Sequence, residues 1–132
     1  MSNWSHVSAI IRIDDFRLDE SVPDFEKLFG KTMTFEDLLE TDDFSEEDYL
    51  PMGSEGSLRM SVHVNEDMSC TASYDVSIFG DLRDHDDPDE LIEWFKGICR
   101  LAEDNFVGVR GACIAVENEI NGLRTWAAGM ED

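Results

Sequence analysis

The sequence predicts an α+β domain with the ferredoxin-like split β-α-β order, βαββαβ, plus one C-terminal strand. Two observations lead to this fold class. Several segments alternate polar and apolar residues with a period of two, which is typical of strands with one buried face. A capped segment with helical spacing lies between the third and fourth of them. Because 132 residues is an ordinary size for one domain, we expect residues 1–132 to form a single domain.

The first strand is indicated by Val7, Ala9, Ile11 and Ile13, which alternate with more polar positions. Residues 58–64 and 70–78 alternate in the same way and are joined by a short polar link at 65–69. Two such runs across a short link predict an antiparallel hairpin.

The main helix is predicted to begin at Asp87. Asp87, Pro88 and Glu90 supply an N-cap, a first-turn proline and a capping carboxylate, and apolar residues follow at helical spacing to residue 102. A strand over 112–116 comes next. Asn121-Gly122 is a strong hairpin signal, so a closing strand should run from Leu123 to about Ala127.

The connection over residues 14–57 is too long to be structureless within a compact domain. Ser21 with Asp24 resembles a capping box, as do the pairs at 34 and 37 and at 45 and 48. We expect a long acidic helical crossover, with one helix near 22–30 and one or two shorter turns. The helices should cover one face of the antiparallel sheet and leave the other open.

The charge of the chain indicates its partners. The formal net charge is −21, and residues 32–58 hold nine acidic residues without a Lys or Arg. Such a surface repels nucleic acid and anionic membranes and attracts basic proteins. Since 42% of the residues are hydrophobic, this is a folded protein and not an acidic tail.

The acid-rich window has two interpretations. It could be the solvated face of a helix, or its carboxylates could imitate phosphates and occupy a basic nucleic-acid groove, with aromatic residues adding contact area. The candidate partner-binding residues are Glu36, Asp37, Glu40, Asp42, Asp43, Phe44, Glu46, Glu47, Asp48 and Tyr49.

A second patch precedes the main helix and consists of Asp81, Arg83, Asp84 and Asp86. Helix capping and the helix dipole account for several of these acids, and a protein contact is the alternative. Calcium is less suited, because the spacing of a calcium loop is missing. Residues 53–57 predict a turn before a strand, since no phosphate-binding pattern surrounds their glycines.

The open sheet face is expected to be polar with a few rings. A metal or acid/base set could form there if His6, His63 and Asp75 approach one another, but an ordinary solvated face is favoured, because no helix-borne His-x-x-x-His fixes their spacing. The stacked aromatics and basic residues of RNA-binding sheets are missing. The residues expected on this face are Trp4, His6, Ser8, Arg59, Ser61, His63, Thr71, Ser73, Asp75 and Ser77.

Cofactors, metals and catalysis are not predicted. Cys70, Cys99 and Cys113 are odd in number, widely spaced and set in apolar patterns, so we expect buried thiols. Neither a nucleophile elbow nor a catalytic triad can be assigned. A signal peptide and a membrane span are also missing from the sequence, which favours a cytoplasmic location.

Three short motifs carry a resemblance. Trp4-Ser5-His6-Val7, the run at 53–58, and the run at 78–84 that leads to Trp94-Phe95 resemble small acidic accessory proteins of tailed bacteriophages. The resemblance implies action in a host cytoplasm, in a class that includes acidic inhibitors of host defence and of nucleic-acid enzymes.

Together these features predict a non-enzymatic acidic protein that inhibits a nucleic-acid-handling host protein by charge mimicry. One alternative is a ligand-binding or sequestering oligomer, such as a homodimer, that uses its open sheet face or sheet edge. The other is a metal-dependent enzyme built on His6, His63 and Asp75. Steep salt dependence, a stoichiometric ligand and bound metal would distinguish the three.

Overall fold

The computed structural model describes residues 3–16, 23–32, 49–66, 71–85, 87–106 and 108–128. Five strands and two helices follow one another in this part of the chain. In order they are β1 (Trp4–Phe16), α1 (Phe25–Phe29), β2 (Arg59–Glu66), β3 (Thr71–Arg83), α3 (Pro88–Asn105), β4 (Gly108–Asn118) and β5 (Gly122–Ala127).

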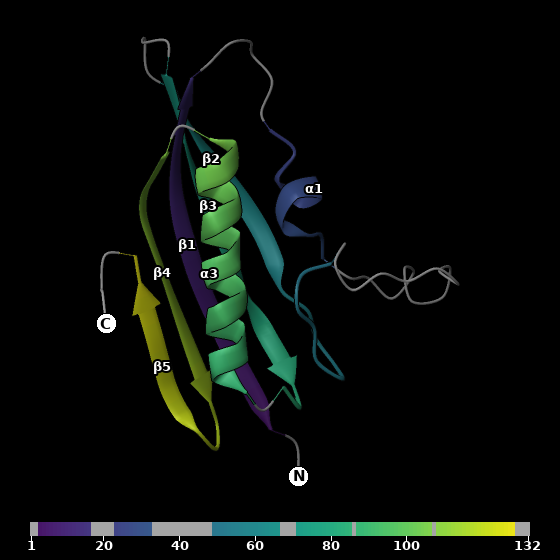
Figure 1. Ribbon diagram of the computed structural model, residues 1–132. Coiled ribbons are helices and arrows are strands. Elements are labelled where there is room, and N and C mark those ends of the chain that lie inside the picture. The colour runs from purple at the N-terminus through teal and green to yellow at the C-terminus, as the bar shows by residue number, and fades with distance from the viewer. Residues whose placement is uncertain are drawn as a thin grey trace, which may run out of the picture.

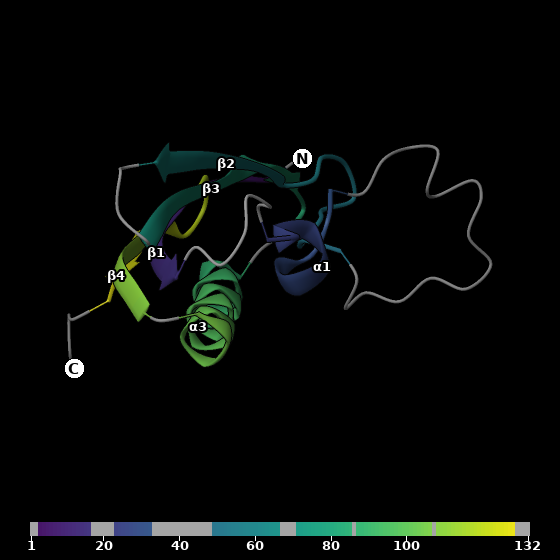
Figure 2. The ribbon, with the colours of Figure 1, turned by 90° about the horizontal axis from the view of Figure 1, so that it is seen from above.

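The described strands form one sheet in the order β2-β3-β1-β4-β5, and every neighbouring pair is antiparallel. Both helices lie on the same side of the sheet, with α3 running along it (Figures 1 and 2). The predicted α+β class, with an antiparallel sheet covered by helices on one face, is confirmed. The opposite face of the sheet is open.

β1 is the central strand, and its alternation is as predicted. Val7, Ala9, Ile11 and Ile13 are buried, and the residues between them face away from the helices. Because successive strand residues point to opposite faces, this alternation fixes which side chains of β1 face the helices and which face the open side.

α3 begins where the sequence predicts. The side chain of Asp87 accepts hydrogen bonds from the backbone N–H groups of Asp89 and Glu90, at 3.0 and 3.2 Å. These bonds satisfy donors that a helix start leaves free. An apolar stripe then faces the sheet, and its buried members are Leu91, Ile92, Phe95, Ile98, Cys99 and Ala102.

α1 is a single turn, shorter than the helix predicted near 22–30. Its N-cap is Asp24, which accepts from the Lys27 N–H at 3.1 Å, whereas Ser21 lies outside the described residues. The ring of Phe25 lies 5.4 Å from that of Tyr74 and 5.5 Å from that of Phe106. α1 therefore closes the core on the β3 side.

The turn predicted at 53–57 docks against the end of β3. The Ser54 N–H donates to the Arg83 carbonyl at 2.8 Å, and the Arg83 N–H donates to the Glu55 carbonyl at 3.0 Å. A Cβ at Gly56, where φ is +81°, would lie 2.1 Å from the Asp81 carbonyl oxygen. Glycine is required there because the loop backbone approaches the strand so closely.

The cysteine prediction is only partly right. Cys99 is buried under the sheet, but Cys113 is exposed on the open face. Its neighbours Ala112 and Ile114 are both buried, so strand alternation turns the Cys113 side chain outward. Cys70 lies outside the described residues.

Several predicted residues cannot be compared with the structure. The capping pairs at 34 and 37 and at 45 and 48 lie outside the described residues, as does Asp86 of the second patch. The partner-binding candidates outside the described residues are Glu36, Asp37, Glu40, Asp42, Asp43, Phe44, Glu46, Glu47 and Asp48.

No described helix is long and apolar enough to cross a membrane.

Three glycine-to-alanine variants test the docking of the loop. Gly56→Ala combines a positive φ with a backbone clash and should cost about 2–4 kcal/mol of unfolding free energy. Gly122→Ala has the same φ with open space around it and should cost about 1–2 kcal/mol. Gly108→Ala meets neither penalty and should be close to neutral. Urea unfolding of the three variants measures the order, and equal losses for Gly56 and Gly122 would contradict the close approach.

Candidate functional site

The open face of the sheet is a grid of side chains set by the strand register. Ser8 on β1 lies between Phe79 on β3 and Ala115 on β4. In the next row, Ile10 lies between Ser77 and Cys113. Neighbouring side chains in a row are about 5 Å apart, and rows are about 7 Å apart along the strands.

The predicted polar face is only half of what the sheet presents. Ile10, Phe79 and Leu123 have 42%, 46% and 58% of their surfaces exposed. The residues expected on this face from the sequence did not include Ile10 or Phe79, nor any residue of the last two strands. Continuing the alternation along 112–116 and 123–127 would have found the apolar half.

A shallow cavity of about 420 Å³ lies across β1, β4 and β5. Ile10, Cys113, Ala115, Thr125 and Ala127 are among its lining residues. Small side chains at 115 and 127, flanked by the larger Ile10, leave the sheet surface hollow at this point. The lining is mostly apolar, so the hollow suits an aliphatic or aromatic side chain.

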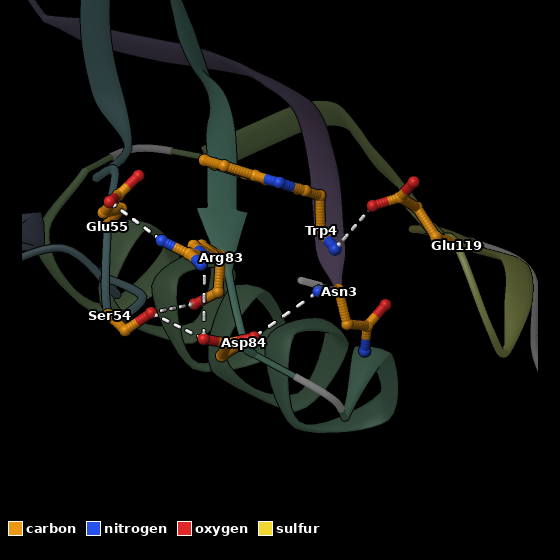
Figure 3. Close-up of polar contacts among 7 residues, drawn as sticks. All are labelled: Asn3, Trp4, Ser54, Glu55, Arg83, Asp84 and Glu119. Atoms are coloured by element: carbon orange, nitrogen blue, oxygen red, sulfur yellow. Dashed lines mark hydrogen bonds and ion pairs between the residues drawn. The ribbon is translucent and has the colours of Figure 1, made fainter. Parts of the chain in front are cut away.

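Next to this apolar area, the end of the face is acidic. The register sets His6 between Asp81 on β3 and Glu117 on β4. Nδ1 of His6 lies 2.7 Å from Oδ1 of Asp81, and this hydrogen bond raises the pKa of His6. Beyond it, the backbone N–H of Trp4 donates a hydrogen bond to the Glu119 carboxylate at 2.8 Å (Figure 3). Carboxylates and an indole thus share one end of the sheet.

The second patch has two different roles. Arg83 pairs with Glu55 at 2.9 Å, and Asp84 accepts from the Ser54 hydroxyl at 2.9 Å (Figure 3). The Ser54 bond is the main reason that the pKa of Asp84 is lowered. Arg83 and Asp84 therefore fasten the loop to the sheet. Asp81 also lies on the open face, two residues before Arg83, and 63% of its side chain is exposed.

A buried polar network supports the acidic end from below. The Ser5 hydroxyl donates to the His85 carbonyl at 2.6 Å, and the Asn118 amide donates to the Ser5 oxygen at 2.8 Å. Oδ1 of Asn118 accepts from the N–H groups of Ile120 and Asn121, which shapes the β4–β5 turn. Glu117 and Glu119, on either side of Asn118, are held on a rigid hairpin.

At the opposite end of the open face the charges are paired. Arg12 lies 3.5 Å from Asp75, and Arg110 lies 2.5 Å from Asp14. The hydrogen bond from Arg110 is the largest cause of the lowered pKa of Asp14. This end is close to neutral, so the face has a charge gradient from one end to the other.

The metal or acid/base set considered as an alternative for His6, His63 and Asp75 does not form. The register pairs His63 with Asp75, but it pairs His6 with Asp81, six residues further along β3. Six strand residues span about 20 Å. Among the described residues, no three His, Cys, Asp or Glu side chains gather around a point that could hold a metal.

Tyr49 was expected at a partner surface, but it belongs to the core. Only 8% of its surface is exposed. Residues 31 and 49 form an isolated parallel bridge, and the Lys31 ammonium lies 5.0 Å from the centre of the Tyr49 ring. Burial of an aromatic ring is favourable, so Tyr49 packs into the core although its neighbours in the sequence are acidic.

The chain was compared with protein-family models, curated proteins and solved structures, and none of the three comparisons gave a match. The candidate site is therefore defined by geometry alone. It is the open sheet face, with an apolar hollow beside an acidic end.

The pairing of His6 and Asp81 can be tested by titration. Asp81→Asn removes the largest cause of the raised pKa, so the titration midpoint of His6 should fall toward 6.5. Because the folded pKa is the raised one, the pair stabilises fully below about pH 6.5 and loses its contribution as the pH rises through the folded pKa. Imidazole chemical shifts measure both midpoints. An unchanged midpoint in Asp81→Asn would contradict the pairing.

The two described cysteines should differ sharply in reactivity. Burial raises the pKa of the Cys99 thiol to about 11, so it is protonated and shielded at pH 8. Cys113 is exposed and should be alkylated by iodoacetamide in the native protein. Peptide mass mapping distinguishes the two sites, and urea should expose Cys99. Equal native rates would contradict the assigned faces of β4 and α3.

Proposed function

We propose that this protein is an acidic, non-catalytic binding protein that occupies a basic, nucleic-acid-binding surface of another protein. The observation that carries the proposal is the distribution of positive charge. Five basic side chains in the described part of the chain lie within ion-pair distance of carboxylates, while the sequence over 33–48 contains eight acidic residues and no Lys or Arg.

The pairing takes up at least five of the nine basic residues in the described part of the chain. Five basic residues lie within ion-pair distance of carboxylates: Arg12, Arg83, Lys96, Arg110 and Arg124. The chain has only ten Lys and Arg against 31 Asp and Glu. Its own bases therefore leave a large surplus of negative charge, which steers the protein toward basic partners.

The class of partner follows from the chemistry of that surplus. Closely spaced carboxylates present negative charge in the way that a phosphate backbone does, so they suit a groove of Lys and Arg that binds nucleic acid. With the resemblance to phage accessory proteins, we infer a bacterial nucleic-acid-handling host protein as the target. The site of action would then be the host cytoplasm.

The proposed scaffold is the ferredoxin-like split β-α-β. Two features support it: β3 lies between β1 and β2, and β4 lies on the other side of β1. β5 extends this arrangement at the β4 edge. A sheet of this kind holds Asp81 and Glu117 in fixed positions, which lowers the cost of ordering these two acids on binding.

Two charge-reversal variants of equal net charge test the proposal. One changes Asp42, Asp43, Glu46 and Glu47 to Lys in the acidic window. The matched control changes Glu90, Glu93, Glu103 and Asp104 to Lys on the exposed surface of α3. Tagged wild type and both variants are incubated with a bacterial lysate at low and high salt, and retained proteins are identified by mass spectrometry.

A captured protein is then purified and tested for competition with DNA. The proposal predicts that wild type and the α3 variant retain it at low salt, that high salt releases it, and that the window variant fails. It also predicts that the wild type displaces labelled DNA from the captured protein. Equal retention by the two variants, or simultaneous binding of DNA, would refute the mimicry.

A further inference from the structure

We propose that the open sheet face is a docking surface for an extended, basic segment of the partner that carries apolar side chains next to Lys or Arg. Apolar side chains would enter the hollow across β1, β4 and β5, and cationic side chains would meet the acidic end. The inference rests on the proposed function, because it assigns a second contact to the same basic partner.

The apolar area is the first reason. Ile10, Phe79 and Leu123 are exposed, and the hollow beside Ile10 has a volume of about 420 Å³. Removing exposed apolar surface from water is favourable, so a partner that covers Ile10 and the hollow gains affinity. Exposed apolar side chains beside a mostly apolar hollow are typical of surfaces that bind apolar side chains of a partner.

The spacing of apolar and acidic groups is the second reason. Along β4, Cys113, Ala115 and Glu117 all face the open side, in rows about 7 Å apart. An extended segment lying along the strands presents its own alternate side chains at the same interval. An apolar residue over the hollow therefore brings a Lys or Arg two positions further along close to Glu117.

Charge complementarity selects the occupant. Asp81, Glu117 and Glu119 form an acidic end with His6 among them, whereas Arg12 and Arg110 at the other end are paired with carboxylates. A segment with its positive charges at one end matches this gradient. A second copy of the chain carries −21 as well, so long-range repulsion opposes self-association.

The acidic end is also held in place before binding. The Asn118 side chain accepts two backbone hydrogen bonds that order the hairpin carrying Glu117 and Glu119. The backbone N–H of Trp4 donates a hydrogen bond to the Glu119 carboxylate. Binding would therefore order few side chains on this protein, which preserves affinity.

Two synthetic peptides of equal charge are the probes. The first alternates small polar residues with a same-side series of leucines followed by lysines. The second has serine in place of each leucine. Fluorescence anisotropy of dye-labelled peptides gives the affinities at low salt, and amide chemical shifts of the labelled protein locate the contact.

The first peptide should bind at least about tenfold more tightly than the second. The changes in amide chemical shift that this peptide causes in the protein should fall on β1, β4 and β5. Ile10→Ser should remove most of that difference, and Ile120→Ser is the matched control, since Ile120 is 76% exposed in the β4–β5 turn, away from the hollow. A double variant, Glu117→Lys with Glu119→Lys, should weaken both peptides. Circular dichroism verifies that each variant is folded.

The outcomes separate the two proposals. Equal affinity for both peptides, or equal effects of Ile10→Ser and Ile120→Ser, overturns the docking surface and leaves the mimicry untouched. Selective peptide binding without any DNA-competing partner supports the surface and overturns the mimicry. If Ile10→Ser instead converts a dimer into a monomer in sedimentation experiments, a second copy covers the face and the inference is wrong.

Discussion

The structure depends on the alternation of β1 between two antiparallel neighbours. Val7, Ile11 and Ile13 are buried beneath α3, and the same register turns His6, Ile10 and Arg12 to the open side. A shift of one residue would exchange the two faces, so burial of the core and composition of the open face are set by a single constraint. The candidate site is thus a direct consequence of how the central strand packs.

That constraint also explains which features could be predicted from the sequence. Strand alternation and the Asp87-Pro88 cap are local signals, and they correctly gave the strands, α3 and the closing hairpin. The face of Cys113 was equally readable, because it lies between two apolar positions that are buried. It was missed because its general tendency to be buried was given more weight than its place in the alternation.

The meeting of distant side chains could not be predicted in the same way. Whether His6 and His63 approach each other depends on the register of two strand pairs, which no short motif encodes. The docking of the 53–57 loop against Arg83 and the burial of Tyr49 are also long-range effects. The net charge could be predicted from the sequence, whereas the ion pairs between distant residues could be identified only from the fold.

Amide hydrogen exchange of the protein, alone and with a basic nucleic-acid-binding partner captured from lysate, tests the central claim most directly. The account predicts slower exchange within residues 33–48 or on β1, β4 and β5, and no change on the exposed surface of α3. Protection confined to α3 would contradict it, because the partner would then ignore both the acidic window and the open sheet face.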